Sequence, residues 1–189
     1  MFNLEQNVHD THKMIAQKAR KVTIERQNAV DATSKALWWA LGVLLLTTVH
    51  HVYGAFVYNT PWRNHVAIVS TLTAAVILAS HYVLRRRTHS VAAGRIAFWV
   101  FAAVTLAIPV VIIGLFEGGY NHVVKDALYF TGASPGLMRQ LFPPPTYEMP
   151  NDALFEITGV LQLVPAVITG WYLIAAVGAH LRSSQYAIS

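Results

Sequence analysis

Four stretches of the chain stay apolar for long enough to cross a lipid bilayer. They run over about 36–58, 62–84, 96–116 and 155–181, and none has Lys, Asp or Glu in its middle. A membrane-spanning helix needs roughly 20 predominantly apolar residues. We therefore predict an all-α integral membrane protein, a four-transmembrane-helix bundle in which residues 117–154 form a long outer loop between helices 3 and 4.

The first 35 residues are polar and are predicted to form a cytoplasmic amphipathic helical segment, followed by the membrane domain, 36–189. Leu4, Val8, Ile15 and Val22 are spaced by four, seven and seven residues, which places them on one stripe of a helix. Such a helix suits the surface of anionic lipid or a partner protein, and a solvated tail is the plainer alternative. The segment has no apolar core of the signal-peptide kind, so we expect no cleavage.

The distribution of basic residues predicts the orientation of the bundle. Eleven of the 14 Lys and Arg residues fall in 1–35, in 85–95 or after the last span, and only Arg63, Lys125 and Arg139 fall on the other side. By the positive-inside rule both termini are cytoplasmic, and a bacterial inner (plasma) membrane is the expected location. The formal charge of +5 follows from this topology, so we expect no nucleic-acid partner.

Composition removes several classes of chemistry. The chain has no cysteine, which excludes disulfides, iron–sulfur clusters, thiolate zinc sites and covalently attached haem. It contains neither a phosphate-binding loop nor a dinucleotide fingerprint, so a nucleotide partner is not expected.

Two spans contain proline, and the outer loop has its own pattern. Pro109 and Pro165 are predicted to kink the third and fourth spans, because proline removes a helical hydrogen bond. In the loop, the sequence predicts a short helix over 122–130 and a stiff polyproline strut at 143–145.

The histidines are the most informative candidates for function. His50 and His51 lie seven or eight residues before the end of the first span, which places them roughly 10–12 Å below the outer surface. Ionisable groups at this depth are costly and usually functional. Because adjacent helical residues point about 100° apart, the two rings need not face the same partner.

A metal site of histidine and carboxylate ligands at the outer end is the first hypothesis. Zinc, iron or copper suits such ligands. The candidate ligands are His50, His51, His65, Glu117, His122 and Glu156, with Arg63, Gln162 and Tyr58 placed to contact the ligands or a substrate. Their spacing matches no metal signature. Glu117 and His122 are five residues apart across two glycines, which a regular helix would not present together.

Three other interpretations stay open, and the sequence names no reaction. The histidines can instead bond neighbouring helices without any cofactor. His81 and His180 are the inner-side pair that b-type haem would require, although arginines follow both and make them typical interfacial anchors. The chain can also be an accessory or assembly subunit of a larger membrane complex, with other membrane subunits or further copies of itself as partners besides the lipid bilayer.

Overall fold

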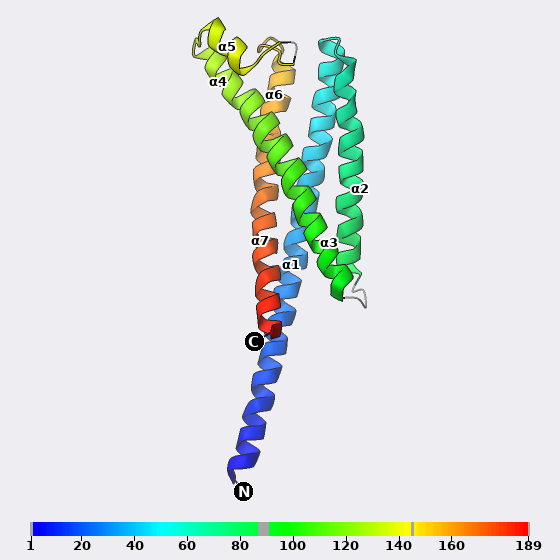
Figure 1. The fold of residues 1–189 in the computed structure, drawn as a ribbon, viewed down its shortest axis with the longest axis vertical. Coiled ribbons are helices and arrows are strands. Elements are labelled where there is room, and N and C mark those ends of the chain that lie inside the picture. Colours follow the sequence, from blue (N-terminus) through cyan, green and yellow to red (C-terminus); the bar gives the residue numbers. More distant parts are fainter. Residues whose placement is uncertain (1, 87–90, 145, 189) are drawn as a thin grey trace.

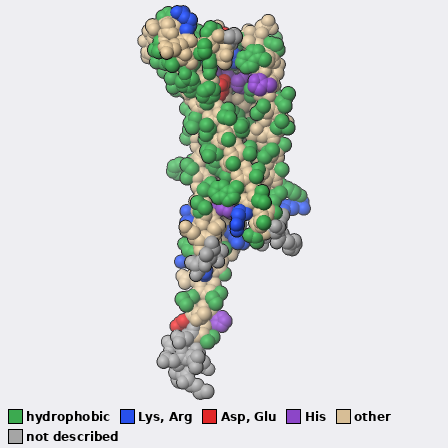
Figure 2. Space-filling view, viewed as in Figure 1, with side chains coloured by type: hydrophobic (Ala, Val, Ile, Leu, Met, Phe, Trp, Pro, Cys, Tyr) green, Lys and Arg blue, Asp and Glu red, His purple; other side chains and the backbone are tan. Residues whose placement is uncertain are grey.

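Four long helical columns make up the molecule (Figure 1). The computed structural model describes residues 2–86, 91–144 and 146–188, and all of the elements in these ranges are helices. Four helices are long and apolar enough to cross a membrane, and they cover Val8–Val57, Pro61–Arg85, Val91–Phe130 and Ala153–Tyr186. The predicted all-helical class and the four spans are therefore confirmed. Figure 2 shows an apolar band along the bundle with Lys and Arg side chains at its two ends.

The first column is a single helix, α1 (Phe2–Val57). The predicted amphipathic segment and the first span are continuous, so no break marks residue 35. The N-terminal part extends past the other helices in Figure 1. Val8 and Ile15 of the predicted stripe are exposed, and the side chain of Leu4 lies outside the described residues.

The last column runs antiparallel beside α1. It consists of α6 (Ala153–Leu161) and α7 (Leu163–Ile188). In Figure 1, α7 continues along α1 past the ends of α2 and α3. Arg182 Nε lies 3.1 Å from Glu25 Oε2, and the Lys21 ammonium lies over the ring of Tyr186. The part of the N-terminal segment from about residue 21 onward is thus a packing partner of α7.

The second column connects α1 to the third. It begins with the short 3-10 helix η1 (Pro61–Asn64) and continues as α2 (His65–Arg85), which packs against α1 and α3 (Val91–Thr105). Arg87, counted above among the basic residues, lies outside the described residues. Here the half of the bundle nearer the termini is called inner and the opposite half outer. The apolar core lies in the inner half, where Phe98 and Phe101 pack against Ile77 and the alanine-rich faces of α1 and α7. Small residues allow such close helix packing in membranes.

The third column is longer than predicted. After α3 it continues as the π-helix η2 (Leu106–Val124) and as α4 (Lys125–Phe130), so Glu117 and the two glycines after it are helical rather than part of a loop. Pro109 has no N–H to donate to Thr105, and the α-type pattern ends at Thr105. The predicted loop starts only after Phe130.

The connection after α4 folds back over the outer end of the bundle. It contains α5 (Pro135–Leu141), whose first turn is capped by the Ser134 hydroxyl. Phe142 is fully buried and packs against the rings of Tyr120 and Tyr147. Of the predicted polyproline strut, Pro145 lies outside the described residues.

The fourth column is broken at Gln162, between α6 and α7. Pro165 is the third residue of α7 and cannot donate a hydrogen bond to the carbonyl of Leu161. The interruption therefore lies where the sequence predicts a kink.

Candidate metal centre

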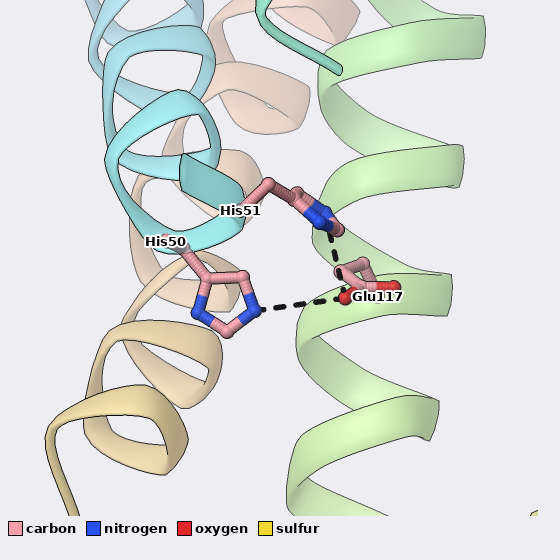
Figure 3. Close-up of side chains that lie close together, drawn as sticks. All are labelled: His50, His51 and Glu117. Atoms are coloured by element: carbon pink, nitrogen blue, oxygen red, sulfur yellow. Dashed lines mark ion pairs between the residues drawn. The ribbon is translucent and has the colours of Figure 1, made fainter. Parts of the chain in front are cut away.

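Three histidine rings surround one carboxylate oxygen near the outer end of the bundle. Glu117 Oε1 lies 3.7 Å from His50 Nε2, 3.6 Å from His51 Nε2 and 3.6 Å from His122 Nε2. Figure 3 shows the two rings from α1 and the carboxylate from η2 facing one another. His50 and His122 are buried, whereas the side chain of Glu117 keeps 18% of its exposure. We refer to these four residues as the His/Glu centre.

The neighbouring histidines of α1 share one partner. Their rings are nearly perpendicular, with centroids 5.1 Å apart, and both Nε2 atoms approach the same oxygen. The sequence left open whether they point to different groups. They converge because Glu117 lies between the two directions in which the side chains leave the helix.

The π-helical geometry of η2 brings Glu117 and His122 together. In an α-helix, residues five apart lie on different faces. A π-helix bonds each N–H to the carbonyl five residues earlier, so residues five apart come round to nearly the same face. The expectation that a helix would not present these two residues together is therefore wrong for this helix type.

Two of the rings are held by a partner on their other nitrogen. His50 Nδ1 lies 3.0 Å from Thr158 Oγ1, and this hydroxyl donates its own hydrogen to the carbonyl of Leu154. The hydroxyl therefore accepts from His50 Nδ1–H. His122 Nδ1 lies 2.7 Å from Glu156 Oε2 and donates to that carboxylate. In the neutral form of each ring, Nε2 then carries a lone pair.

In the neutral rings these lone pairs face a carboxylate oxygen, which is unfavourable unless a proton or a metal cation lies between the two atoms. The three separations exceed an ordinary hydrogen bond. They are close to the roughly 3.3 Å between two ligands of a tetrahedral ion with bonds of about 2.0–2.1 Å. His50 Nε2 is buried without a hydrogen-bond partner. The arrangement therefore suits a metal ion, and a histidine held through its second nitrogen is typical of metal sites.

A second acidic group beside the centre already holds a positive charge. Lys125 Nζ lies 3.0 and 3.1 Å from the two carboxylate oxygens of Glu156, and Asp126 is close by. His122, Asp126 and Glu156 also have the separations of a metal site. Because the Lys125 ammonium occupies both oxygens of Glu156, the His/Glu centre is the better metal site.

Neither Lys125 nor Asp126 is among the residues predicted from the sequence. Both fall in the short helix predicted over 122–130, which was expected to lie in an outer loop where charged side chains are normally solvated. Lys125 is instead 2% exposed, since α4 continues the third column and turns this side chain inward. Only the continuity of this helix with the third span, which the sequence did not predict, would have indicated this.

An open cleft of about 540 Å³ lies next to the second acidic group, between α4 and α6. Asp126 and Glu156 are part of its wall. Its outer rim includes Asn151 and Asp152, which accept hydrogen bonds from Tyr58 and Tyr53 of the first column. The carboxylate that bonds His122 thus borders this cleft.

The remaining predicted outer residues have different positions. Arg63 is buried and lies over the rings of Tyr58, Trp62 and Phe155, close to the centre but not in it. Gln162 is fully buried at the end of α6, one helical turn after Thr158. His65 is exposed, contacts the carbonyl of Trp62 and is not part of the cluster.

Two tyrosines outside the spans remain neutral phenols. Burial raises the pKa of Tyr58, and the negative charges of Glu156 and Asp152 raise it further. Burial also raises the pKa of Tyr147, with a contribution from the charge of Glu117. Tyr58 can therefore act as a hydrogen-bond donor to Asn151 across the physiological pH range.

The two histidines considered for haem have separate neighbours. His81 Nε2 lies 3.4 Å from the Ser34 hydroxyl, and the His180 ring stacks on Phe98 at 3.9 Å. The stacking of His180 on Phe98 leaves one face of that ring already covered. Neither contact tests the haem interpretation, which stays a prediction.

Fold and site together define an all-helical protein with four helices able to span a membrane and with buried histidine and carboxylate groups that could hold a metal ion. Comparisons with protein-family models, with curated proteins and with solved structures found no match.

Proposed function

We propose that this protein is an integral membrane protein that binds a transition metal ion at the His/Glu centre. The observation that carries the proposal is the convergence of three imidazole nitrogens on Glu117 Oε1, two of them with their lone pairs directed at it by Thr158 and Glu156. Glu117 supplies the negative charge, and Asn121 holds its other oxygen at 2.7 Å. The centre lies toward the outer, periplasmic side, with both termini cytoplasmic in a bacterial inner membrane.

Imidazole and carboxylate ligands favour zinc, iron or copper over magnesium or calcium. The ion would be bound by His50, His51 and Glu117, whose ligand atoms all lie within 4.8 Å of one another. His122, with its Nε2 3.6 Å from the same Glu117 oxygen, would be a fourth ligand. Glu156 acts through His122, and Arg63 adds a positive charge near the outer end of the site. His65 has no part in this proposal.

Elemental analysis and an absorption spectrum of the detergent-purified protein test the proposal. We expect about one zinc, iron or copper ion per chain and no Soret band. A Soret band would favour haem, and the absence of any metal, even after incubation with each ion, would contradict the proposal.

Substitution of Glu117 distinguishes the centre from adventitious binding. Glu117→Gln keeps the shape of the side chain but removes its charge, and we expect the bound ion to be lost. His65→Ala is the matched control, because it removes an exposed histidine at the same end of the bundle. Equal metal content in Glu117→Gln and in the wild-type protein would exclude this carboxylate as a ligand.

A second candidate function is that of an accessory subunit of a membrane complex. It is favoured by the part of α1 that extends beyond α7. Val8, Met14 and Ile15 are 54–64% exposed on the part of the helix beyond α7. Removal of residues 1–20 spares the contacts of Lys21 and Glu25 with α7. If this candidate is right, the truncated protein migrates as a smaller native particle in gentle detergent. An unchanged particle would contradict it.

A further inference from the structure

Gln162 is a buried polar side chain whose amide group has no hydrogen-bond partner. It is 0% exposed, and neither its amide oxygen nor its amide nitrogen has a hydrogen-bond partner. Leaving an amide unsatisfied in an apolar interior costs several kcal/mol, and leucine or methionine would fill the same space without this cost. Buried polar groups without partners are rare and call for an explanation.

The position of Gln162 follows from the two faces of α6 that contact α1 and η2. Phe155 and Thr158 face α1, where they contact His50. Glu156 and Gly159 face η2, where Glu156 bonds His122 and Gly159 leaves room for its ring. Gln162 follows Thr158 by four residues and Gly159 by three, so it continues both faces.

The side chain of Gln162 therefore belongs to the space that α1, α6 and η2 enclose, one turn inward of the His/Glu centre. Its β-carbon lies against Gly118, the residue after Glu117. The ring of His122 lies against Gly159, three residues before Gln162, and its centroid is 4.8 Å from that of the His50 ring. Gln162 is thus at the inner side of the centre, whereas Arg63 and Tyr58 lie at its outer side.

We propose that Gln162 is the polar wall of a ligand subsite on the inner side of the metal, and that the ligand is a water molecule or hydroxide. This inference rests on the proposed metal site. A solvent ligand bound to the metal donates a hydrogen bond to Oε1 of Gln162 and accepts one from Nε2, which satisfies both atoms. Metal sites that react, unlike purely structural ones, keep such a position for solvent or substrate. Gln162 is a positioning residue in this scheme and does not bind the metal.

Cobalt provides the readout, because its visible absorption depends on coordination number. The protein is loaded with Co²⁺ alone, and the wild type is compared with Gln162→Met and Gln162→Glu. In Gln162→Met the solvent ligand loses its hydrogen bonds. We expect the same cobalt content with a several-fold stronger visible absorption, as the ion becomes four-coordinate. Gln162→Glu retains an acceptor and is expected to restore the weaker wild-type absorption.

Thr105→Val is the matched control. Thr105 is also fully buried with an unpartnered hydroxyl, but it lies twelve residues inward of Glu117 on the same column. Its spectrum is expected to equal that of the wild type. An unchanged spectrum in Gln162→Met, or the same change in Thr105→Val, would overturn the role of Gln162.

A measurement on the wild-type protein covers the case in which Gln162→Met does not fold. Pulsed EPR of the Cu²⁺-loaded protein in D₂O is expected to show deuterium coupling from a directly bound solvent molecule. A bound ion without such coupling would overturn the subsite but leave the metal centre in place. A wild-type protein that binds neither cobalt nor copper would instead contradict the metal centre itself.

Discussion

At the scale of single residues, the important feature is the partner on the second nitrogen of His50 and of His122. Thr158 and Glu156 fix which nitrogen of His50 and His122 faces Glu117, and they also fix the planes of the rings. A ligand that is oriented before the metal arrives binds it more tightly, since less rotational freedom is lost on binding. These partners should therefore influence metal affinity without contacting the metal.

Replacement of Thr158 by valine tests this effect. Thr158→Val keeps the size of the side chain but removes the acceptor for His50 Nδ1, and we expect metal affinity to fall by about 10–100-fold. Competition with a chelator of known affinity measures the change. Thr71→Val is the control, because Thr71 bonds only its own helix on an exposed face. Equal affinities in the two variants would argue against a role for Thr158.

Lys125 provides a second prediction at this scale. Lys125→Met leaves the buried carboxylate of Glu156 without its ammonium partner, so the free energy of unfolding should fall by about 3–5 kcal/mol. Unfolding in mixed micelles measures this change. The double variant Lys125→Met/Glu156→Gln removes both charges and should recover most of the loss. If the double variant is less stable than Lys125→Met, the pairing is not the cause.

At the scale of elements, the centre depends on two departures from regular helix. The π-helical hydrogen bonding of η2 aligns Glu117 with His122, and the close approach of α6 to η2 needs glycine at position 159. A β-carbon on Gly159 would overlap the ring of His122. The helices are therefore shaped around the ring, and π-type turns are frequent at functional sites.

The variant Gly159→Ala should displace the His122 ring. We expect weaker metal binding together with a loss of about 1–3 kcal/mol in stability, the usual range for an overpacked site. Metal content and thermal unfolding are measured on the same preparation. Gly42→Ala, where a β-carbon meets no atom within 4 Å, should leave metal binding unchanged and should not lower stability, since alanine is the better helix former. Normal metal binding by Gly159→Ala would contradict the placement of His122.

The sequence predicted the elements better than their exact limits. Hydrophobic length alone identified the four spans, because each must match the thickness of a bilayer. Proline identified the interruption near Gln162. A short helix over 122–130 was predicted, but its continuity with the third span through Glu117 could not be, since Gly118 and Gly119 are poor helix formers. Without that continuation, neither the partnership of Glu117 with His122 nor the burial of Lys125 could be anticipated.

At the scale of the whole molecule, the apolar core and the His/Glu centre lie toward opposite ends of the bundle. The apolar core occupies the inner half, and the buried ionisable residues of the centre occupy the outer half. The candidate ligands came from the sequence because histidines at membrane depth are unusual. His65 was included on its position alone, and the structure places its ring beside Trp62 instead.

Orientation in the membrane gives a prediction for the whole molecule. A reporter fused after residue 189 should lie in the cytoplasm, and a reporter inserted near Ala133 should lie outside, because basic residues cluster at the end of the bundle that holds the termini. Alkaline phosphatase and green fluorescent protein report the two locations. The opposite pattern would place the His/Glu centre toward the cytoplasm.

X-ray absorption spectroscopy of the protein loaded with one equivalent of zinc tests the central claim most directly. Three imidazoles and one carboxylate should give nitrogen and oxygen neighbours at about 2.0–2.1 Å. The outer carbon and nitrogen atoms of the rings should add the multiple scattering that is characteristic of histidine. A zinc ion surrounded only by oxygen, without this imidazole signal, would contradict the account.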